Sequence, residues 1–316
     1  MGKEVYMDDC IKVSQKTKNN ELYHYTTANG LKSILDTNEF WVTRSDFLND
    51  RSEIEYTRSI IEKVCRECIC DNVVCNKFLE AVEKEIVECN YGIGSGEIEI
   101  KGGYYILSFS TEKDSITLWS EYSQFMGYSI GFKQQELIGE IKKYRGQSIC
   151  WHGNVIYAED IQIQRIKEAL TDRAPYIRGK TYEEIIEKCI KEPQSQDAME
   201  DFKNLVMDFS VITSVYAMFF KQPCFKEENE YRIVFSAFHE GAGAGLEKKM
   251  NFREKEGFLI PYIVTKVKER NELLPVMNIT VAPKNTVDLA VRGMEYFLKA
   301  KGYDVPIIKS QIPLRY

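Results

Sequence analysis

The chain has 316 residues, of which 44% are hydrophobic and 28% are charged, and its formal net charge is −6. This composition is that of a globular protein with a large core, and it excludes a disordered or collagen-like chain. Because no segment forms a sustained basic stripe, the charge disfavours tight non-specific binding to DNA or RNA. The most apolar run, residues 211–220, is too short to cross a bilayer.

The amino-terminal region is polar and lacks the apolar core of a signal peptide. We therefore expect a cytoplasmic protein without a membrane partner, in which residues 1–20 form a loose extension. The cysteine count of nine is odd, which predicts reduced thiols. Four cysteines fall within residues 65–75 at spacings compatible with zinc. The flanking sequence has a helical period, however, and no glycine turn separates the first two, so we predict helical thiols and no metal site.

Short strands and helical blocks alternate irregularly along the rest of the chain. The hydrophobic pattern predicts strands over residues 22–27, 40–43, 103–110, 127–132, 154–158, 230–237, 258–267, 277–283 and 305–315. It predicts helices over residues 28–38, 50–90 (one or two), 115–124, 160–220 (several) and 286–303.

This order predicts a single α+β domain over residues 21–316, with the helical segments at about 50–90 and 160–220 inserted between core strands. The chain contains no G-x-G-x-x-G and no G-x-x-x-x-G-K motif, which excludes the usual nucleotide-binding loops. The glycine-rich GAGAG at 241–245 predicts a hairpin connection or a mobile loop.

His24 is one of only three histidines and lies in the middle of the predicted strand LYHYTT. Strand alternation places His24 and Thr26 on one face, where a ring nitrogen and a hydroxyl can both bond a ribose or an amide. The alternative is a core histidine that is bonded to the backbone.

The stretch WVTRSDFLNDRSE at 41–53 crowds polar residues at a strand-to-helix junction. Arg44, at the end of the strand, could clamp phosphates or form a surface salt bridge. Asp50 and Glu53 have the spacing of a helix N-cap and capping box.

The strand LSFS contains Ser108 and Ser110 at alternate positions, and a short helix follows with Trp119 and Tyr122 on one face. We expect these two aromatic rings to pack against the core, or one of them to stack on a flat ligand ring.

Three acidic residues enter a later strand in FKEENEYRIVF, at 225–235. On an extended strand, Glu228, Glu230 and Arg232 share a face. The arrangement is an ion pair, or a cluster that meets water or a cationic ligand, and we count all three among the candidate binding residues.

Taken in order, LYHYTTANGLKSIL, EFWVTRSDFLNDRSE, LSFSTEKDSITLWSEYSQFMGYSIGF, FKEENEYRIVF and SQIPLR resemble a bacterial family known as domain of unknown function (DUF) 2971, from about residue 21 to the carboxyl terminus. The family name implies no activity.

The opening strand with His24, its helix and the strand ending in Arg are also similar to the start of the ADP-ribosyltransferase fold, in its DNA-modifying toxin branch. That resemblance implies a split, mixed or antiparallel β-sheet core and NAD as a substrate. His24 would match the first catalytic strand, and Ser108 or Ser110 the middle one. Glu230, with Glu228 as a rival, would match the late glutamate. The long helical segment before this glutamate departs from the family's pattern.

The resemblance also implies roles for these residues. Glu230 would bond the ribose 2′-hydroxyl and stabilise the positive charge that develops when the glycosidic bond breaks. His24 and Thr26 would hold the ribose and the nicotinamide amide, Arg44 would hold the pyrophosphate, and Tyr25 or Tyr23 would stack on a ring.

The resemblance therefore predicts an ADP-ribosyltransferase or NAD glycohydrolase of bacterial anti-phage defence or a toxin system, with an unknown nucleic-acid or protein acceptor. A second hypothesis is a non-catalytic module that senses a nucleotide or nucleic acid. A third is a metal-dependent hydrolase or nuclease that uses Asp50, Glu53 and Glu230.

Overall fold

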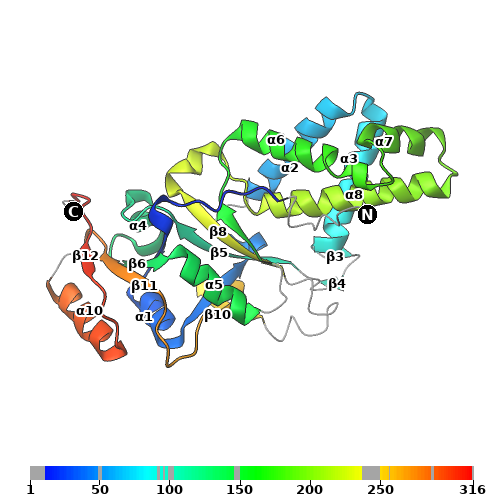
Figure 1. The fold of residues 1–316 in the computed structure, drawn as a ribbon. Coiled ribbons are helices and arrows are strands. Elements are labelled where there is room, and N and C mark those ends of the chain that lie inside the picture. The colour runs from blue at the N-terminus through cyan, green and yellow to red at the C-terminus, as the bar shows by residue number, and fades with distance from the viewer. Residues whose placement is uncertain are drawn as a thin grey trace.

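The structure, a computed structural model, describes residues 11–48, 52–90, 93–94, 97–98, 103–145, 150–236, 250–255, 257–285 and 288–314. It confirms an α+β protein. A ten-stranded, mostly antiparallel sheet lies between helices on both sides (Figure 1). Asp50 and residues 241–245, for which the sequence made predictions, lie outside the described residues.

The strands of the sheet run in the order β12-β11-β6-β1-β5-β2-β10-β9, and β8 and β7 extend it from β5. Neighbours are antiparallel except β11 and β12. The bounds are β1 (Glu21–Thr26), β2 (Glu39–Arg44), β5 (Tyr104–Ser110), β6 (Tyr128–Lys133), β7 (Cys150–Asn154), β8 (Glu230–Ser236), β9 (Asn251–Lys255), β10 (Phe258–Lys266), β11 (Val276–Val281) and β12 (Ile307–Lys309). A separate pair joins β3 (Ile93–Gly94) and β4 (Glu97–Ile98).

The sheet forks at β5. One edge of β5 pairs with β8 along its whole length, from Tyr104 to Ser110. The other edge is shared, because β1 meets β5 at Ser110 whereas β2 meets it at Tyr105 and Ile106. Between these two contacts, no described strand pairs with residues 107–109 on this edge. The backbone of this stretch therefore faces the opening between β1 and β2.

Three helices cover one face of the sheet: α1 (Ala28–Thr37), α5 (Gln134–Arg145) and α10 (Asp288–Lys301). Helix α1 forms as its sequence predicts. Thr27 caps its first turn by accepting a hydrogen bond from the Gly30 N–H, and Leu31, Ile34 and Leu35 bury one stripe. The helix ends at Asn38, whose φ of 58° is the left-handed conformation that asparagine tolerates.

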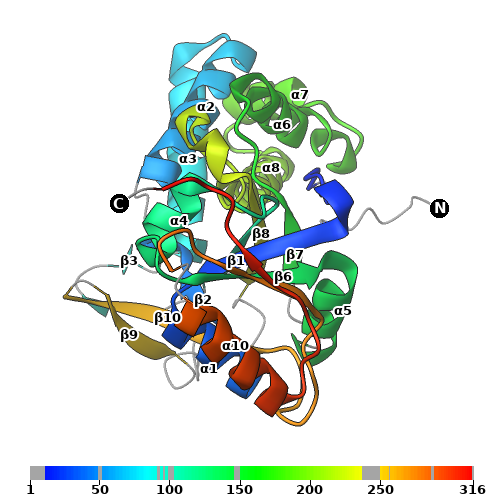
Figure 2. The ribbon, with the colours of Figure 1, turned by 90° about the vertical axis from the view of Figure 1, so that its left-hand side faces the viewer.

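A helical lobe with its own apolar core lies on the other side (Figure 2). It consists of α2 (Ser52–Cys68), α3 (Asn72–Asn90), α6 (Glu159–Thr171), α7 (Tyr182–Lys191) and α8 (Gln196–Ala217). Cys65 and Cys75 are buried in this core, and burial raises the pKa of both thiols. Cys65 and Cys68 lie in α2 and Cys75 in α3, as predicted, whereas Cys70 lies in the connection between the two helices. No described helix is long and apolar enough to cross a membrane.

Several boundaries differ from the predictions. The strand that was expected at 154–158 lies earlier in the chain, as β7 (Cys150–Asn154). Beyond β7, Ile156 forms a single bridge with Phe220. The final strand is limited to β12, and β9 and α5 were not predicted.

The amino-terminal segment is anchored from residue 11 rather than loose. The Lys12 N–H donates to the Tyr216 hydroxyl (3.0 Å), and the Asn154 N–H donates to the Ser14 carbonyl (2.8 Å). This segment therefore ties the helical lobe to the sheet.

Candidate functional site

A cavity of about 560 Å³ opens at the fork of the sheet, a size within the usual range of ligand pockets. Its walls come from β1, α1, β2, β5, α4 (Ile116–Ser123), β8 and β9. Eight of the nine predicted site residues line it: His24, Tyr25, Thr26, Ser108, Ser110, Glu228, Glu230 and Arg232. The cavity thus brings together residues from both ends of the chain.

His24 fills the opening between β1 and β2. Its Nδ1 lies 3.1 Å from the Ser108 carbonyl, within the stretch of β5 that pairs with no described strand on the edge facing β1 and β2. Because a carbonyl only accepts, Nδ1 carries the hydrogen and Nε2 remains an acceptor. Rings of Phe40 and Phe109 pack against the imidazole at 5.4 and 5.5 Å. Burial lowers the pKa of His24 to about 4, so it is neutral at pH 7.

The core interpretation of His24 accounts for its backbone bond, whereas the ligand role stays a prediction. The side chain is bonded to the backbone, as a core histidine would be, and it lines the cavity as well.

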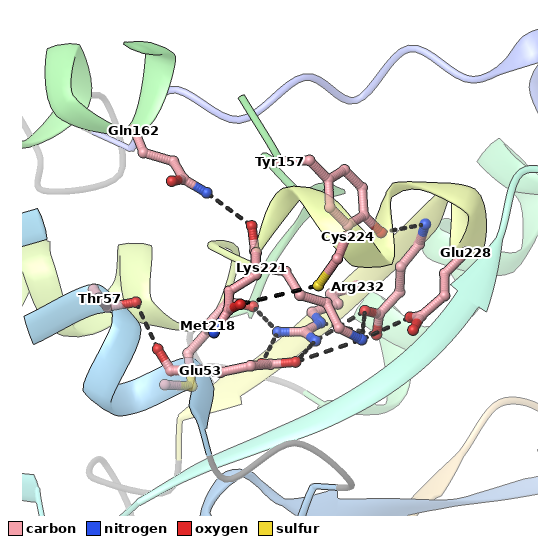
Figure 3. A network of polar contacts seen from close by, with 11 residues as sticks. Glu53, Thr57, Tyr157, Gln162, Met218, Lys221, Cys224, Glu228 and Arg232 are labelled. Carbon is pink, nitrogen blue, oxygen red and sulfur yellow. Dashed lines mark hydrogen bonds and ion pairs between the residues drawn. The ribbon is translucent and has the colours of Figure 1, made fainter. Parts of the chain in front are cut away.

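Arg232 is the centre of a buried ion cluster (Figure 3). Its Nε and Nη2 donate to the two oxygens of Glu230, both at 2.8 Å. Its Nη1 and Nη2 donate to the two oxygens of Glu53, at 2.9 and 2.8 Å. The remaining Nη1 hydrogen goes to the Met218 carbonyl at 2.8 Å. All five guanidinium donors are therefore satisfied, as burial of this group requires.

Lys221 adds a second cation to the cluster. Its Nζ lies 2.6 Å from Glu228, 3.5 Å from Glu53 and 3.6 Å from Glu230. Three carboxylates thus face two cations, which leaves one negative charge in excess when all are ionised. Burial raises the pKa of Glu228 to about 7 against the opposing effect of Lys221. Burial acts the same way on Glu230, but Arg232 and Lys221 outweigh it and lower its pKa to about 2.

The local backbone explains how both glutamates reach the cluster. Glu228 ends the 3₁₀ helix η5 (Pro223–Glu228), and Glu230 begins β8. Asn229 lies between them in the left-handed conformation, with φ of 44°. The expectation that Glu228 shares the strand with Glu230 and Arg232 was wrong, because the turn at Asn229 separates it from the strand.

The two serines of β5 have different environments. Ser108 lies beside Glu230, and its hydroxyl contributes to the lowered pKa of that carboxylate. The Ser110 hydroxyl donates to the Glu228 carbonyl (2.8 Å) and accepts from the Glu112 N–H (3.0 Å). Ser110 therefore stabilises the turn, and of the two only Ser108 contacts the carboxylate.

The aromatic residues of α4 divide between core and cavity. Trp119 is fully buried, packs edge-on against Tyr25 at 4.7 Å and donates to Asp114 (2.6 Å). The Tyr25 hydroxyl bonds the Glu112 carbonyl and the Ser115 N–H. A packing role therefore accounts for both rings. Tyr122 is 37% exposed and lines the cavity.

The structure decides between the alternative roles of Arg44 and gives Glu53 a role that differs from the expected one. Arg44 donates to Asp46 (2.9 Å) and lies outside the cavity lining, so the salt-bridge alternative holds. Glu53 is buried and bonds Arg232 through both carboxylate oxygens, so a capping box does not account for it.

Lys221 and Arg253 are cavity residues that the sequence interpretation missed. Lys221 directly follows the most apolar run of the chain, and a charge in that position was the available signal. Arg253 lies in a short strand, NFREK, without a clear hydrophobic alternation.

Residues 118–233, a little over a third of the chain, match the model of the family described as "Protein of unknown function (DUF2971)". The match is shorter than the resemblance expected from residue 21 onwards. It includes Tyr122 and the Lys221 to Arg232 part of the cluster, but not His24 or Glu53. No curated protein and no solved structure matched the chain.

Proposed function

We propose that the cavity binds NAD and that the protein cleaves the bond between nicotinamide and ribose, in the manner of an ADP-ribosyltransferase. The acceptor is a nucleic acid, a protein or water. One observation supports this most: His24 from β1 and Glu230 from β8 line the same cavity, with Ser108 of β5 between their strands. These are the residue types that the chemistry requires.

The ionised Glu230 suits the charge that develops in this reaction. As nicotinamide leaves, positive charge grows on the ribose, and a nearby carboxylate stabilises it more in the transition state than in the ground state. The lowered pKa of Glu230 keeps it ionised at neutral pH. Arg232 fixes both oxygens in place. Of the roughly four acceptor positions of the carboxylate, Arg232 takes two and Ser108 takes one, which leaves one for a ribose hydroxyl.

The neutral His24 suits the other part of the ligand. Its Nε2 can accept a hydrogen bond from an amide or hydroxyl of the nicotinamide riboside, while Ser108 holds the ring orientation through Nδ1. Thr26, on the same strand, and Tyr122, across the cavity, supply a hydroxyl and an aromatic wall.

The ion cluster favours this reaction over metal-dependent hydrolysis. A divalent ion bound by Glu53 and Glu230 would lie beside the positive charges of Arg232 and Lys221, and the Arg232 guanidinium already bonds all four carboxylate oxygens. A sensor that binds a nucleotide without cleaving it remains the second candidate, because the cavity supports binding equally well.

We further propose that the protein acts in the bacterial cytoplasm in anti-phage defence or a toxin system. This part rests on the resemblance of the His24 and Arg44 strands to the toxin branch.

The test is nicotinamide release from NAD by the purified protein, with EDTA present and with or without cell lysate. Release in EDTA supports the proposal, and release only with lysate identifies a macromolecular acceptor. Binding of NAD without release in either condition would favour the sensor.

A further inference from the structure

We infer that the β9 end of the cavity is a phosphate-binding subsite built around Arg253. The inference deepens the proposed function, since it assigns the anionic part of the same ligand to a residue far from the acidic cluster. The phosphate role that the sequence suggested for Arg44 would then belong to Arg253.

The side chain of Arg253 is directed into the cavity and only partly bonded. Its Nη2 donates to the Thr43 hydroxyl at 2.8 Å, and the residue is half-buried. Its Nε is buried without a hydrogen-bond partner among the described residues. No described carboxylate forms an ion pair with it. The neighbouring Glu254 instead accepts from the Gly257 N–H (2.7 Å).

The contrast with Arg232 shows what Arg253 lacks. Arg232 satisfies all five donors, mainly with two carboxylates, whereas Arg253 has a single neutral partner in the described part of the chain. Buried cations are normally paired with anions. Because no described residue bonds Nη1 and Thr43 is the one described partner of Nη2, the terminal nitrogens of Arg253 retain donors for an anion in the cavity.

Charge effects place this guanidinium close to the ligand position. Arg253 and His24 line the same cavity, and the positive charge of Arg253 helps burial to lower the pKa of His24. Burial lowers the pKa of Arg253 itself, in line with the absence of a described counter-ion. An anion held here would lie beside the ring that we place against the nicotinamide riboside.

The strand order determines how long a ligand must be to contact both Glu230 on β8 and Arg253 on β9. The order β8-β5-β2-β10-β9 puts four strand spacings between Glu230 and Arg253. At about 4.8 Å each, the two backbones are roughly 19 Å apart. Because the Arg253 guanidinium reaches back to Thr43 on β2, two strand spacings, or roughly 10 Å, separate it from β8. A ligand that contacts both side chains therefore spans about this distance. It carries a hydroxyl-rich or cationic part at β8 and an anion at the guanidinium.

A phosphate is the anion that fits this guanidinium. Arginine binds phosphate oxygens through two parallel N–H donors, and the terminal Nη1 and Nη2 provide such a pair. The bond to Thr43 holds the guanidinium plane in one orientation. The subsite therefore fits the phosphates of a nucleotide.

The experiment compares ADP with adenosine by isothermal titration calorimetry, using the wild type, Arg253→Gln and Arg270→Gln. Arg270 is an exposed arginine after β10 and serves as the matched control. We expect the wild type and Arg270→Gln to bind ADP at least tenfold more tightly than adenosine. In Arg253→Gln we expect this preference to disappear while adenosine affinity stays the same.

Three results would overturn the subsite: no ADP binding by the wild type, an unchanged ADP preference in Arg253→Gln, or an equal loss of both ligands. These results are distinct from failure of the proposed function. A protein that binds ADP through Arg253 but never releases nicotinamide keeps the subsite and loses the reaction. One that cleaves NAD with an unchanged KM in Arg253→Gln keeps the reaction and loses the subsite.

Discussion

Glu53 and Glu230, 177 positions apart in the chain, are held by the two sides of one guanidinium, that of Arg232. The pairing joins the first helix of the helical lobe to the strand that carries the proposed catalytic carboxylate. The lobe therefore helps to position Glu230 as well as to cover the sheet.

Removing Arg232 should destabilise the fold strongly. Arg232→Met leaves two buried carboxylates without their main partner, and the loss of one member of a buried pair costs about 3–5 kcal/mol. The exposed Arg66, which pairs with Glu62 four residues earlier, is the control, and Arg66→Met should cost about 0.5 kcal/mol or less. Urea unfolding of both variants measures the difference, and equal losses would mean that the cluster contributes no more than a surface pair.

Glu228 should make stability depend on pH in a defined direction. Its folded pKa of about 7 is raised above the ordinary 4.5, so its favourable contribution is complete below pH 4.5 and is lost as the pH rises through 7. At about 1.4 kcal/mol per pKa unit, the loss is roughly 3 kcal/mol.

Glu228→Gln should therefore be more stable than the wild type at pH 8 but not at pH 4, as measured by urea unfolding at both values. Glu227→Gln, a change in the exposed neighbour, is the control and should show no such dependence. If Glu228→Gln loses stability equally at both pH values, the raised pKa of Glu228 does not determine how this residue affects stability.

Substitutions of Trp119 and Tyr122 should have different effects, one on the free energy of unfolding and the other on ligand affinity. Trp119→Ala removes a fully buried ring and should cost about 3–5 kcal/mol of unfolding free energy. Tyr122→Ala changes a partly exposed cavity residue, and should weaken ADP-ribose binding severalfold with little effect on stability. Calorimetric titration and urea unfolding of both variants test the division, which would be wrong if Tyr122→Ala unfolded the protein without altering affinity.

The sequence could predict features that depend on neighbouring residues. The strand with His24, the α1 helix with its Thr27 cap and the approach of Glu230 and Arg232 all follow from local spacing. Their presence in one cavity was expected from a family resemblance, not from the local pattern.

Features that depend on long-range pairing could not be predicted. The fork at β5 arises because β1 and β2 share one edge of a strand, and no local pattern encodes that arrangement. Glu53 has the spacing of a capping residue, and its partner Arg232 is 179 positions away. Arg253 lies on a short edge strand of mainly exposed residues, where burial leaves little pattern to read.

The Glu230 carboxylate is proposed to stabilise the positive charge that develops on the ribose of NAD. The most direct measurement is the rate of nicotinamide release by Glu230→Gln, with the exposed Glu227→Gln as the control and thermal unfolding to verify that both fold. We predict a loss of at least 100-fold in Glu230→Gln and an unchanged rate in Glu227→Gln. A folded Glu230→Gln that releases nicotinamide at the wild-type rate would contradict the claim.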